Sequence, residues 1–251
     1  INGGFRLEHL DRDYAGTSAP ADRDDSAFSA SGGFAHDLSD LWNLSGNLNY
    51  SERMPDSAEL YGDGAHHATE AFEIGNPSLD DESAVGFELI LRRSTEKVSA
   101  QVTGYHTRYS DYIYLSDTGV QRDGDGLNPP VGEALDERIY KGVSAKFYGI
   151  EAEVDWLAME NANWSLVLSA QGDLVRARNT SDGANLPRTP PATLGLGFDI
   201  LRDKLSFGMN LTRAMKQDDL APNETATSGY SLLDAYASYD VAFGDSQGAL
   251  F

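Results

Sequence analysis

The feature that most constrains the fold of this chain is a strict alternation of apolar and polar residues that recurs along most of its length. Between residues 148 and 156 the even-numbered positions are aromatic or aliphatic, and the odd-numbered positions are Gly149, Glu151, Glu153 and Asp155. Successive side chains on a β-strand point to opposite faces, so such a segment forms a strand with one apolar and one hydrated face. The segments have at least the roughly 9–11 residues that a tilted strand needs to cross a bilayer. The pattern therefore predicts an all-β fold, an antiparallel transmembrane β-barrel.

The expected strands are separated by gaps that alternate between short and long. The strands are predicted at residues 1–12, 26–37, 41–53, 83–94, 97–115, 140–158, 161–178, 191–202, 204–215 and 229–243. The long gaps are polar and acidic, at 11–25, 55–82, 116–139, 179–190 and 216–228, and the short ones are at 37–40, 94–97, 159–161, 203 and 244–247. This alternation places every long gap at one end of the barrel, which is the extracellular end in outer-membrane barrels. Aromatic residues near strand ends are expected in the interfacial girdles: Trp42, Tyr50, Tyr112, Tyr114, Trp156, Trp164 and Tyr230.

Composition narrows the classes of function. The net charge of −21 argues against nucleic acid and against an anionic membrane surface as partners. Mean hydropathy is −0.42, and the absence of any apolar run of about 18 residues excludes helical membrane spans. The chain has no cysteine, which excludes disulfide frameworks and thiolate metal sites. It starts in strand-like sequence and ends where another strand begins, so we interpret it as a fragment whose two open sheet edges would prevent a stable isolated barrel.

Several sequence blocks point to a known family. The segment after Arg53 contains Met-Pro at 54–55, Glu-Leu-Tyr at 59–61, His-His-Ala-Thr at 66–69, and Gly-Asn-Pro at 75–77, followed by Leu79 and Glu82. Later blocks are Phe-Tyr-Gly-Ile-Glu at 147–151, Leu-Pro-Arg-Thr-Pro-Pro at 186–191 and Gly-Tyr-Ser-Leu-Leu-Asp at 229–234. The ordered set resembles the barrel of TonB-dependent outer-membrane receptors over nearly the whole chain.

The resemblance implies an active importer in the outer membrane of a Gram-negative bacterium. Residues 1–251 would form part of a single barrel domain, about 10–11 strands of a plugged barrel of about 22 strands. Its partners would be outer-membrane lipid, a metal or metal-chelate substrate, and the TonB energy-transducing complex, which acts through an N-terminal part that is absent from this sequence. The version of the 59–77 blocks is most similar to the zinc-uptake branch, and a ferric-siderophore receptor is the alternative. No resident cofactor is expected.

Two groups of side chains are candidates for binding. His66 and His67 share one long gap with Asp63, Glu70 and Glu73, and imidazole with carboxylate is a donor set that suits zinc. Adjacent histidines in an extended segment point apart, so we expect at most one of them to bind alongside a given carboxylate. The second group is the acidic row Glu151, Glu153 and Asp155, which is expected to face the lumen, where it holds a cation or hydrogen-bonds a plug.

Other classes of function are weaker. Paired aspartates such as Asp24-Asp25 and Asp218-Asp219 have no histidine on a matching rim, and no Gly-x-Ser-x-Gly elbow occurs, so the chain is not predicted to be an enzyme. The segment Asp123-Gly124-Asp125-Gly126 lacks the rest of an EF-hand and is taken as a loop tip. A passive porin would have no plug. A soluble acidic β-sandwich would have short loops at both ends, and the alternation of short and long gaps argues against that fold.

Overall fold

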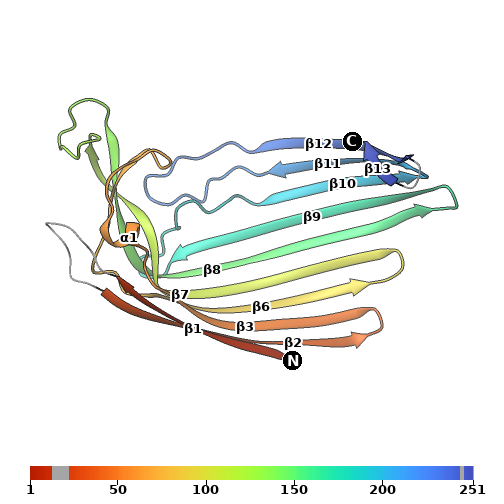
Figure 1. Ribbon diagram of the computed structural model, residues 1–251, viewed down its shortest axis with the longest axis horizontal. Helices are drawn as coiled ribbons and strands as arrows, with labels where there is room; N and C mark the ends of the chain where they lie inside the picture. Colours follow the sequence, from red (N-terminus) through yellow and green to blue (C-terminus); the bar gives the residue numbers. More distant parts are fainter. Residues whose placement is uncertain (13–22, 244–245, 251) are drawn as a thin grey trace.

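The computed structural model describes residues 1–12, 23–243 and 246–250, and most of them belong to one β-sheet (Figure 1). Eleven of the described strands follow one another in the order β1-β2-β3-β6-β7-β8-β9-β10-β11-β12-β13, each antiparallel to its neighbours. Their bounds are β1 (Asn2–Arg12), β2 (Arg23–Ser39), β3 (Trp42–Arg53), β6 (Glu82–Ser94), β7 (Val98–Arg122), β8 (Leu135–Glu160), β9 (Trp164–Asn179), β10 (Thr193–Arg202), β11 (Leu205–Ala214), β12 (Tyr230–Phe243) and β13 (Ser246–Leu250). The fold class predicted from the alternation is confirmed.

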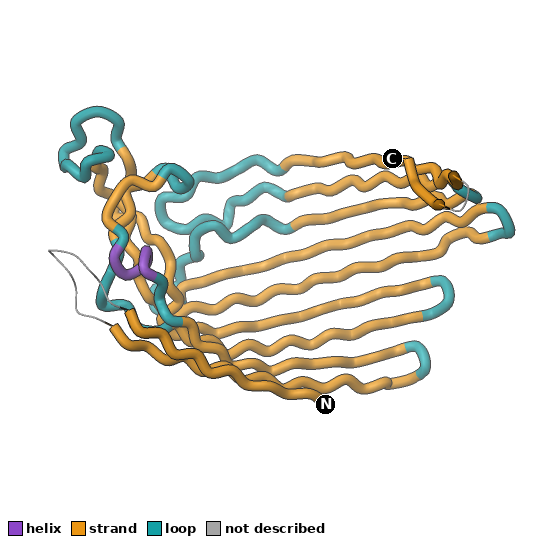
Figure 2. Tube along the Cα trace, in the orientation of Figure 1, coloured by secondary structure: helices purple, strands orange, loops and turns teal. Residues whose placement is uncertain are grey.

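Short and long connections lie at opposite ends of the sheet, as predicted (Figure 2). Two-residue or three-residue turns join β2 to β3, β6 to β7, β8 to β9 and β10 to β11. The long connections after β3, β7, β9 and β11 all leave from the other end, which we call the loop end. The predicted gap at 11–25 lies partly outside the described residues, as does the gap at 244–247.

The sheet has one apolar face that is continuous across its strands. The register aligns Leu48 of β3 with Phe87 of β6, Phe87 with His106 of β7, and His106 with Tyr148 of β8. Leu48 is 57% exposed and Phe87 is 49% exposed, and within the described residues the apolar face is left open to its surroundings. An uncovered apolar face of this extent fits contact with lipid. The other face, which we call the polar face, carries Asn47, Glu88 and Glu151.

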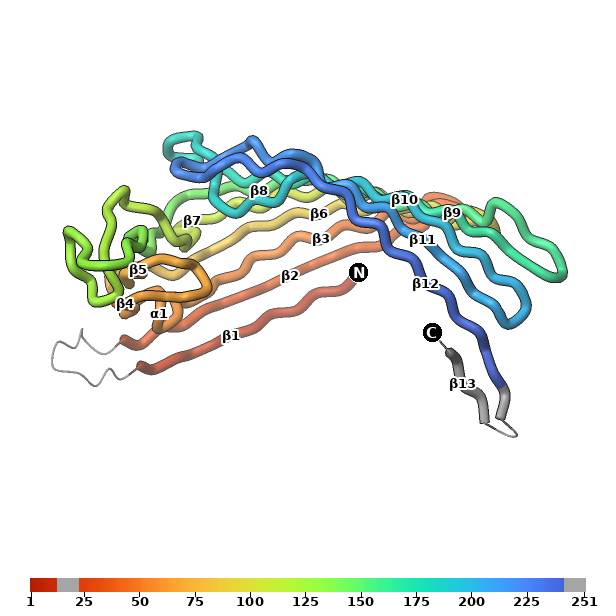
Figure 3. Tube along the Cα trace, turned by 90° about the horizontal axis from the view of Figure 1, so that it is seen from above, coloured from red at the N-terminus to blue at the C-terminus, as the bar shows by residue number. Residues whose placement is uncertain are grey.

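The sheet is curved into an arch with β1 on one side and β12 on the other (Figure 3). β1 and β13 are its edges, and each is hydrogen-bonded on one side only among the described residues. No helix in the described part is long and apolar enough to cross a membrane.

The structure departs from the sequence predictions at the loop end. The hairpin of β7 and β8 extends well beyond the predicted strands, to Arg122 and from Leu135. The gap at 55–82, expected as a loop, contains helix α1 (Ser57–Tyr61) and strands β4 (Asp63–His66) and β5 (Ala71–Ile74). The girdle prediction is wrong for Tyr112 and Tyr114, because the ladder shifts between Tyr109 and Tyr112 and turns both rings onto the polar face, where Tyr112 packs against Phe147.

Candidate functional site

The segment between β3 and β6 is a folded insert rather than an open loop. It starts with α1, where Asp56 and Glu59 form a reciprocal capping box that satisfies free amide groups at the helix start. Leu60 of this helix is fully buried against Leu79 and Ile113. This small apolar core docks the insert against β7, and the burial of one leucine contributes about 1.5–3 kcal/mol to it.

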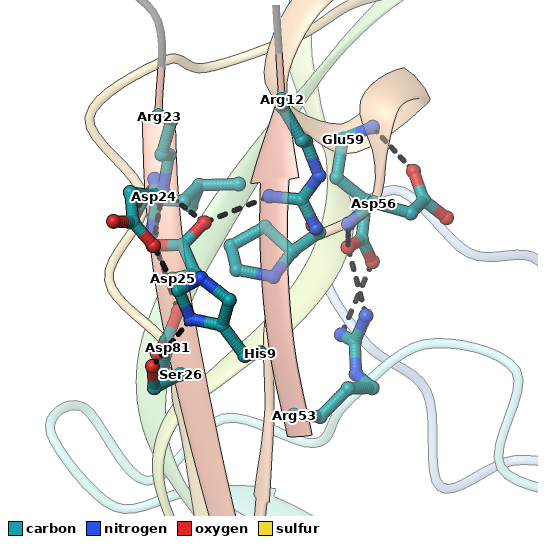
Figure 4. A network of polar contacts seen from close by, with 12 residues as sticks. His9, Arg12, Arg23, Asp24, Asp25, Ser26, Arg53, Asp56, Glu59 and Asp81 are labelled. Carbon is teal, nitrogen blue, oxygen red and sulfur yellow. Dashed lines mark hydrogen bonds and ion pairs between the residues drawn. The ribbon is translucent and has the colours of Figure 1, made fainter.

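Ion pairs join the base of the insert to the first strands of the sheet (Figure 4). Arg12 of β1 donates to Asp25 at 2.8 Å and to the carbonyl of Pro55 at 2.6 Å. Arg23 of β2 donates to the carbonyl of Leu79 at 2.7 Å, and its guanidinium also contacts Asp25. Since the Arg12 and Asp25 side chains are 12% and 10% exposed, these contacts are well shielded from solvent and fix where the insert leaves the sheet.

The hairpin of β4 and β5 carries the predicted metal residues. β5 pairs in parallel with the start of β8, where Glu73 is opposite Arg138. β4 pairs with β5 so that Gly64 lies opposite Glu73 and His66 opposite Ala71. Residues on one face of a strand alternate, so His66 and Glu73 project from the same face of the hairpin, whereas Asp63 projects from the other.

Glu73 is the centre of a hydrogen-bonded cluster. Its Oε1 accepts from the Thr69 hydroxyl at 2.6 Å and lies 3.1 Å from Nδ1 of His66. Its Oε2 accepts from the Tyr140 hydroxyl of β8 at 3.0 Å. The Glu73 side chain is 11% exposed, whereas His66 is 58% exposed, so the cluster presents an imidazole to solvent and holds the carboxylate beneath it.

The surroundings of Glu73 favour its ionised form. Burial by itself raises the pKa of this carboxyl, but the hydrogen bonds from Thr69, Tyr140 and His66 together outweigh burial and hold the pKa below its ordinary value. Glu73 is therefore a carboxylate at neutral pH, which is the form that binds a metal ion.

The other predicted ligands do not join this cluster. His67 and Glu70 lie in the turn between β4 and β5, and both are exposed, as is Asp63. No group of three or more His, Asp or Glu side chains in the described ranges is arranged to hold a metal ion. Of the five predicted residues, the structure brings together His66 and Glu73.

Sequence analysis missed Thr69 and Tyr140. Thr69 stands within the predicted segment, and a hydroxyl four residues before Glu73 in a tight hairpin was a usable signal. Tyr140 is 67 residues from Glu73 along the chain, and only the parallel pairing of β5 with β8 brings them together. No local sequence pattern predicts that pairing.

The acidic row lies on the polar face. Glu151 pairs with Thr103 and Asp173, Glu153 with Gln101 and Gln171, and Asp155 with Ser99 and Ser169. An open hollow of about 270 Å³ lies over this region, lined by Glu151, Glu153, Asp173 and their neighbours. Most of the side chains beside the row are neutral and polar, so its negative charge stays available for a cation or for donors from another segment.

A second hollow, of about 180 Å³, lies at the loop end between the connections that follow β9 and β11. It is lined by Tyr114, Arg138 and Arg188 together with the acidic side chains Asp117, Asp182 and Glu224. The two guanidinium groups supply hydrogen-bond donors for an anionic group, and the three carboxylates beside them make the net charge of the lining negative.

The Asp-Gly-Asp-Gly segment is a structural loop tip, in agreement with its interpretation from sequence. The Asp123 carboxylate accepts from the backbone amides of Leu127 at 2.8 Å and Val131 at 2.9 Å. These bonds hold the pKa of Asp123 below its ordinary value. Its oxygens are engaged with backbone donors, so they order the loop rather than offer a calcium site.

Comparisons with known proteins agree with this architecture. The family model described as TonB dependent receptor-like, beta-barrel matches residues 1–248. Among solved structures, the copper transporter OprC superposes with a TM-score of 0.74 at 20% identity, covering 96% of this chain and 37% of that one. The siderophore receptor PirA from Acinetobacter baumannii gives 0.58 at 16% identity, covering 88% and 35%. The FrpB iron transporter from Neisseria meningitidis gives 0.59 at 15% identity, covering 94% and 35%.

The family match establishes the family of this chain, and the superpositions on solved structures establish its fold. The chain spans little more than a third of the length of the solved structures it resembles. The family consists of transport receptors rather than enzymes, and its barrels belong to the outer membrane of Gram-negative bacteria. With an arched antiparallel sheet, an apolar outer face and a family match over residues 1–248, this chain belongs to the TonB-dependent receptor β-barrel family.

Proposed function

We propose that the complete protein is an outer-membrane receptor for active, TonB-coupled uptake of a scarce metal or metal chelate. Support comes from the family and from the names of its structural neighbours, which include a copper transporter, a siderophore receptor and an iron transporter. In this proposal residues at the loop end capture the substrate, the polar face with Glu151, Glu153 and Asp155 lines its path, and a plug outside this chain couples release to energy. The protein binds and gates without covalent chemistry.

Zinc capture at the β4–β5 hairpin is our preferred form of this function, and the contact between His66 and Glu73 is the observation that carries it. Imidazole nitrogen and carboxylate oxygen are common zinc ligands, and here they lie 3.1 Å apart at the surface of the loop end. Two ligands hold a metal weakly, and water or a chelating group would complete the coordination. Weak capture suits a receptor that must release its substrate. The same donor set binds copper, so the named neighbours do not favour zinc over copper.

The test is calorimetric titration of the complete protein with zinc and, separately, with copper. His66→Ala and Glu73→Gln are each expected to weaken binding about tenfold or more, because each removes one of two protein ligands. His67→Ala is the matched control, since His67 lies next in sequence but has no contact with Glu73. Unchanged binding in His66→Ala, or equal losses in His66→Ala and His67→Ala, would remove the hairpin as the capture site.

A ferric siderophore is the second candidate substrate, favoured by the loop-end hollow with Arg138 and Arg188. The anionic oxygen atoms of a siderophore complex would accept hydrogen bonds from these guanidinium groups. Arg188→Gln is then expected to weaken binding of an anionic ferric chelate and leave zinc titration unchanged. Loss of chelate binding combined with no zinc binding to the wild type would shift the assignment from zinc to siderophore.

A further inference from the structure

Three cations form a row across neighbouring strands on the apolar face. Arg108 of β7 pairs with Lys146 of β8, and Lys146 pairs with Arg178 of β9. The register is unbroken from this row down to the apolar pairs below it, so the three side chains project from the same face as Tyr148 and Ile150. Cations on a face that contacts lipid need a specific explanation, because Lys or Arg at the bilayer midplane costs about 2–4 kcal/mol.

The row lies just outside the apolar band, at the loop end. On β8 the band is bounded by Tyr148 and Trp156, whose separation of eight residues corresponds to about 27 Å along the strand. With a tilt of about 40° this spans about 21 Å of membrane, close to the roughly 25 Å band of outer-membrane barrels. Tyr148 is stacked on His106 at 6.4 Å and marks the boundary. Lys146 lies one step further, about 7 Å beyond it, at the level of lipid headgroups.

These cations are unpaired although acidic residues are abundant. The chain has 40 Asp and Glu against 19 Lys and Arg, and the nearby Arg176 forms an ion pair with Asp219 at 2.7 Å. Within the described part of the chain, Arg108, Lys146 and Arg178 have no ion pair or side-chain hydrogen bond, and Nε of Arg178 is buried without an acceptor. The row is left with three positive charges and unused donors.

A hollow of about 650 Å³ lies beside the row. Arg108 and Lys146 line it together with the hydroxyl residues Ser83, Ser110 and Thr180. The Thr180 hydroxyl also donates to the carbonyl of Ser144 at 3.1 Å. The remaining lining residues are Ala84, Val85, Tyr109 and Ala145. By register, Ser83 and Ser110 are paired with each other and lie on the face that carries Arg108. Ammonium, guanidinium and hydroxyl donors around one hollow are the groups that bind a phosphate.

We propose that this row and its hollow bind the phosphate-bearing headgroup of a lipid in the outer leaflet, whose acyl chains lie on the apolar band below. Charge complementarity selects an anionic headgroup, and the position next to the band selects a lipid over a soluble anion. The contact would anchor the barrel at a fixed depth and leave the lumen and the loop-end hollow free. The proposal depends on placement of the barrel in the membrane and not on which substrate is carried.

The test uses the complete protein in detergent, with native mass spectrometry to count bound lipid and a titration with lipid A, a phosphorylated glycolipid, as the probe. The triple variant R108Q/K146Q/R178Q is expected to bind lipid A at least tenfold more weakly, since each cation near an anionic lipid contributes about fivefold. The charge-preserving variant R108K/K146R is expected to bind like the wild type. K97Q/R202Q/K204Q removes the same charge at the short-turn end and serves as the matched control, with binding unchanged.

Two further measurements distinguish binding of a lipid headgroup from binding of the lipid's other groups or of free phosphate. Lipid A without its phosphates is expected to bind weakly, and inorganic phosphate is expected not to compete at concentrations comparable to the lipid. Any one of four results would overturn the proposal. These are wild-type affinity in the triple variant, an equal loss of affinity in the control variant, equal binding of the phosphate-free lipid, and competition by inorganic phosphate. Folding is verified from the heat-dependent electrophoretic shift of the barrel, and the single variant R108Q, expected to lose about fivefold, replaces the triple variant if that one does not fold.

Discussion

Removal of one hydroxyl, in Tyr140→Phe, tests whether the Glu73 cluster attaches the insert to the barrel. The Tyr140 hydroxyl donates to Glu73 at 3.0 Å, and the carboxylate is 11% exposed. A hydrogen bond to a charged group contributes about 1.5–3 kcal/mol, and we take the lower end because Thr69 and His66 still bond the other oxygen. About 1.5 kcal/mol corresponds to slightly more than a tenfold change in an opening equilibrium. Backbone amides of β4 and β5 are therefore expected to exchange about tenfold faster in hydrogen–deuterium exchange of the complete protein.

The matched control is Tyr114→Phe, on the strand next to Tyr140. Tyr114 is stacked with Tyr112 at 6.5 Å, and its hydroxyl has no hydrogen bond among the described residues. Exchange in β4 and β5 should be unchanged in this variant. Unchanged exchange in Tyr140→Phe, or equal acceleration in strands far from the insert such as β10 and β11, would refute the attachment described here.

Two further predictions concern the same insert. Because the pKa of Glu73 in the folded insert lies below the ordinary value of 4.5, the stabilisation from this carboxylate is fully present above that value and is lost as pH falls through the folded pKa. Amide protection at 63–74, corrected for intrinsic exchange rates, should therefore be constant near neutral pH and should decrease as the pH falls below 4.5. Glu73→Gln should abolish this dependence. Leu60→Ala should destabilise the insert by about 2–5 kcal/mol, since Leu60 is fully buried, and protease cleavage within 54–81 should accelerate, whereas Leu127→Ala in an exposed loop should have little effect.

The barrel was predictable because its main signal is local. Alternation with a period of two is a direct consequence of strand geometry, and it located the strands from β1 through β12 to within a few residues, except at the loop end of β7 and β8, which extend further than predicted. Polar, acidic gaps identified the connections, and antiparallel order followed from their lengths. The insert escaped prediction because α1, β4 and β5 are each four or five residues long, too short for a period to show.

The candidate site was predictable only in part. The residue types in 63–73 indicated a metal-binding segment, and the structure does place His66 against Glu73. Which histidine would contact a carboxylate depended on where β4 ends and the turn begins. The role of Tyr140 depended on a parallel pairing between segments far apart in sequence. Such non-local contacts carry no signature in the residues that flank them.

A single bulge explains why even-numbered residues of β7 replace odd-numbered ones on the polar face at the loop end. Up to Ser110 the odd-numbered residues lie on the polar face, as Tyr105 and Tyr109 do, and Arg108 faces lipid. Asp111 has a φ of 56°, a conformation that aspartate tolerates better than most residues, and the ladder resumes with Tyr112 opposite Val143. Even-numbered Tyr112 and Tyr114 therefore join Tyr109 on the polar face, and Ile113 turns to the face on which Leu60 packs. The bulge thus lies at the boundary of the membrane-facing part of β7. The part of β7 before the bulge faces lipid, and the part after it supports the insert that carries His66 and Glu73.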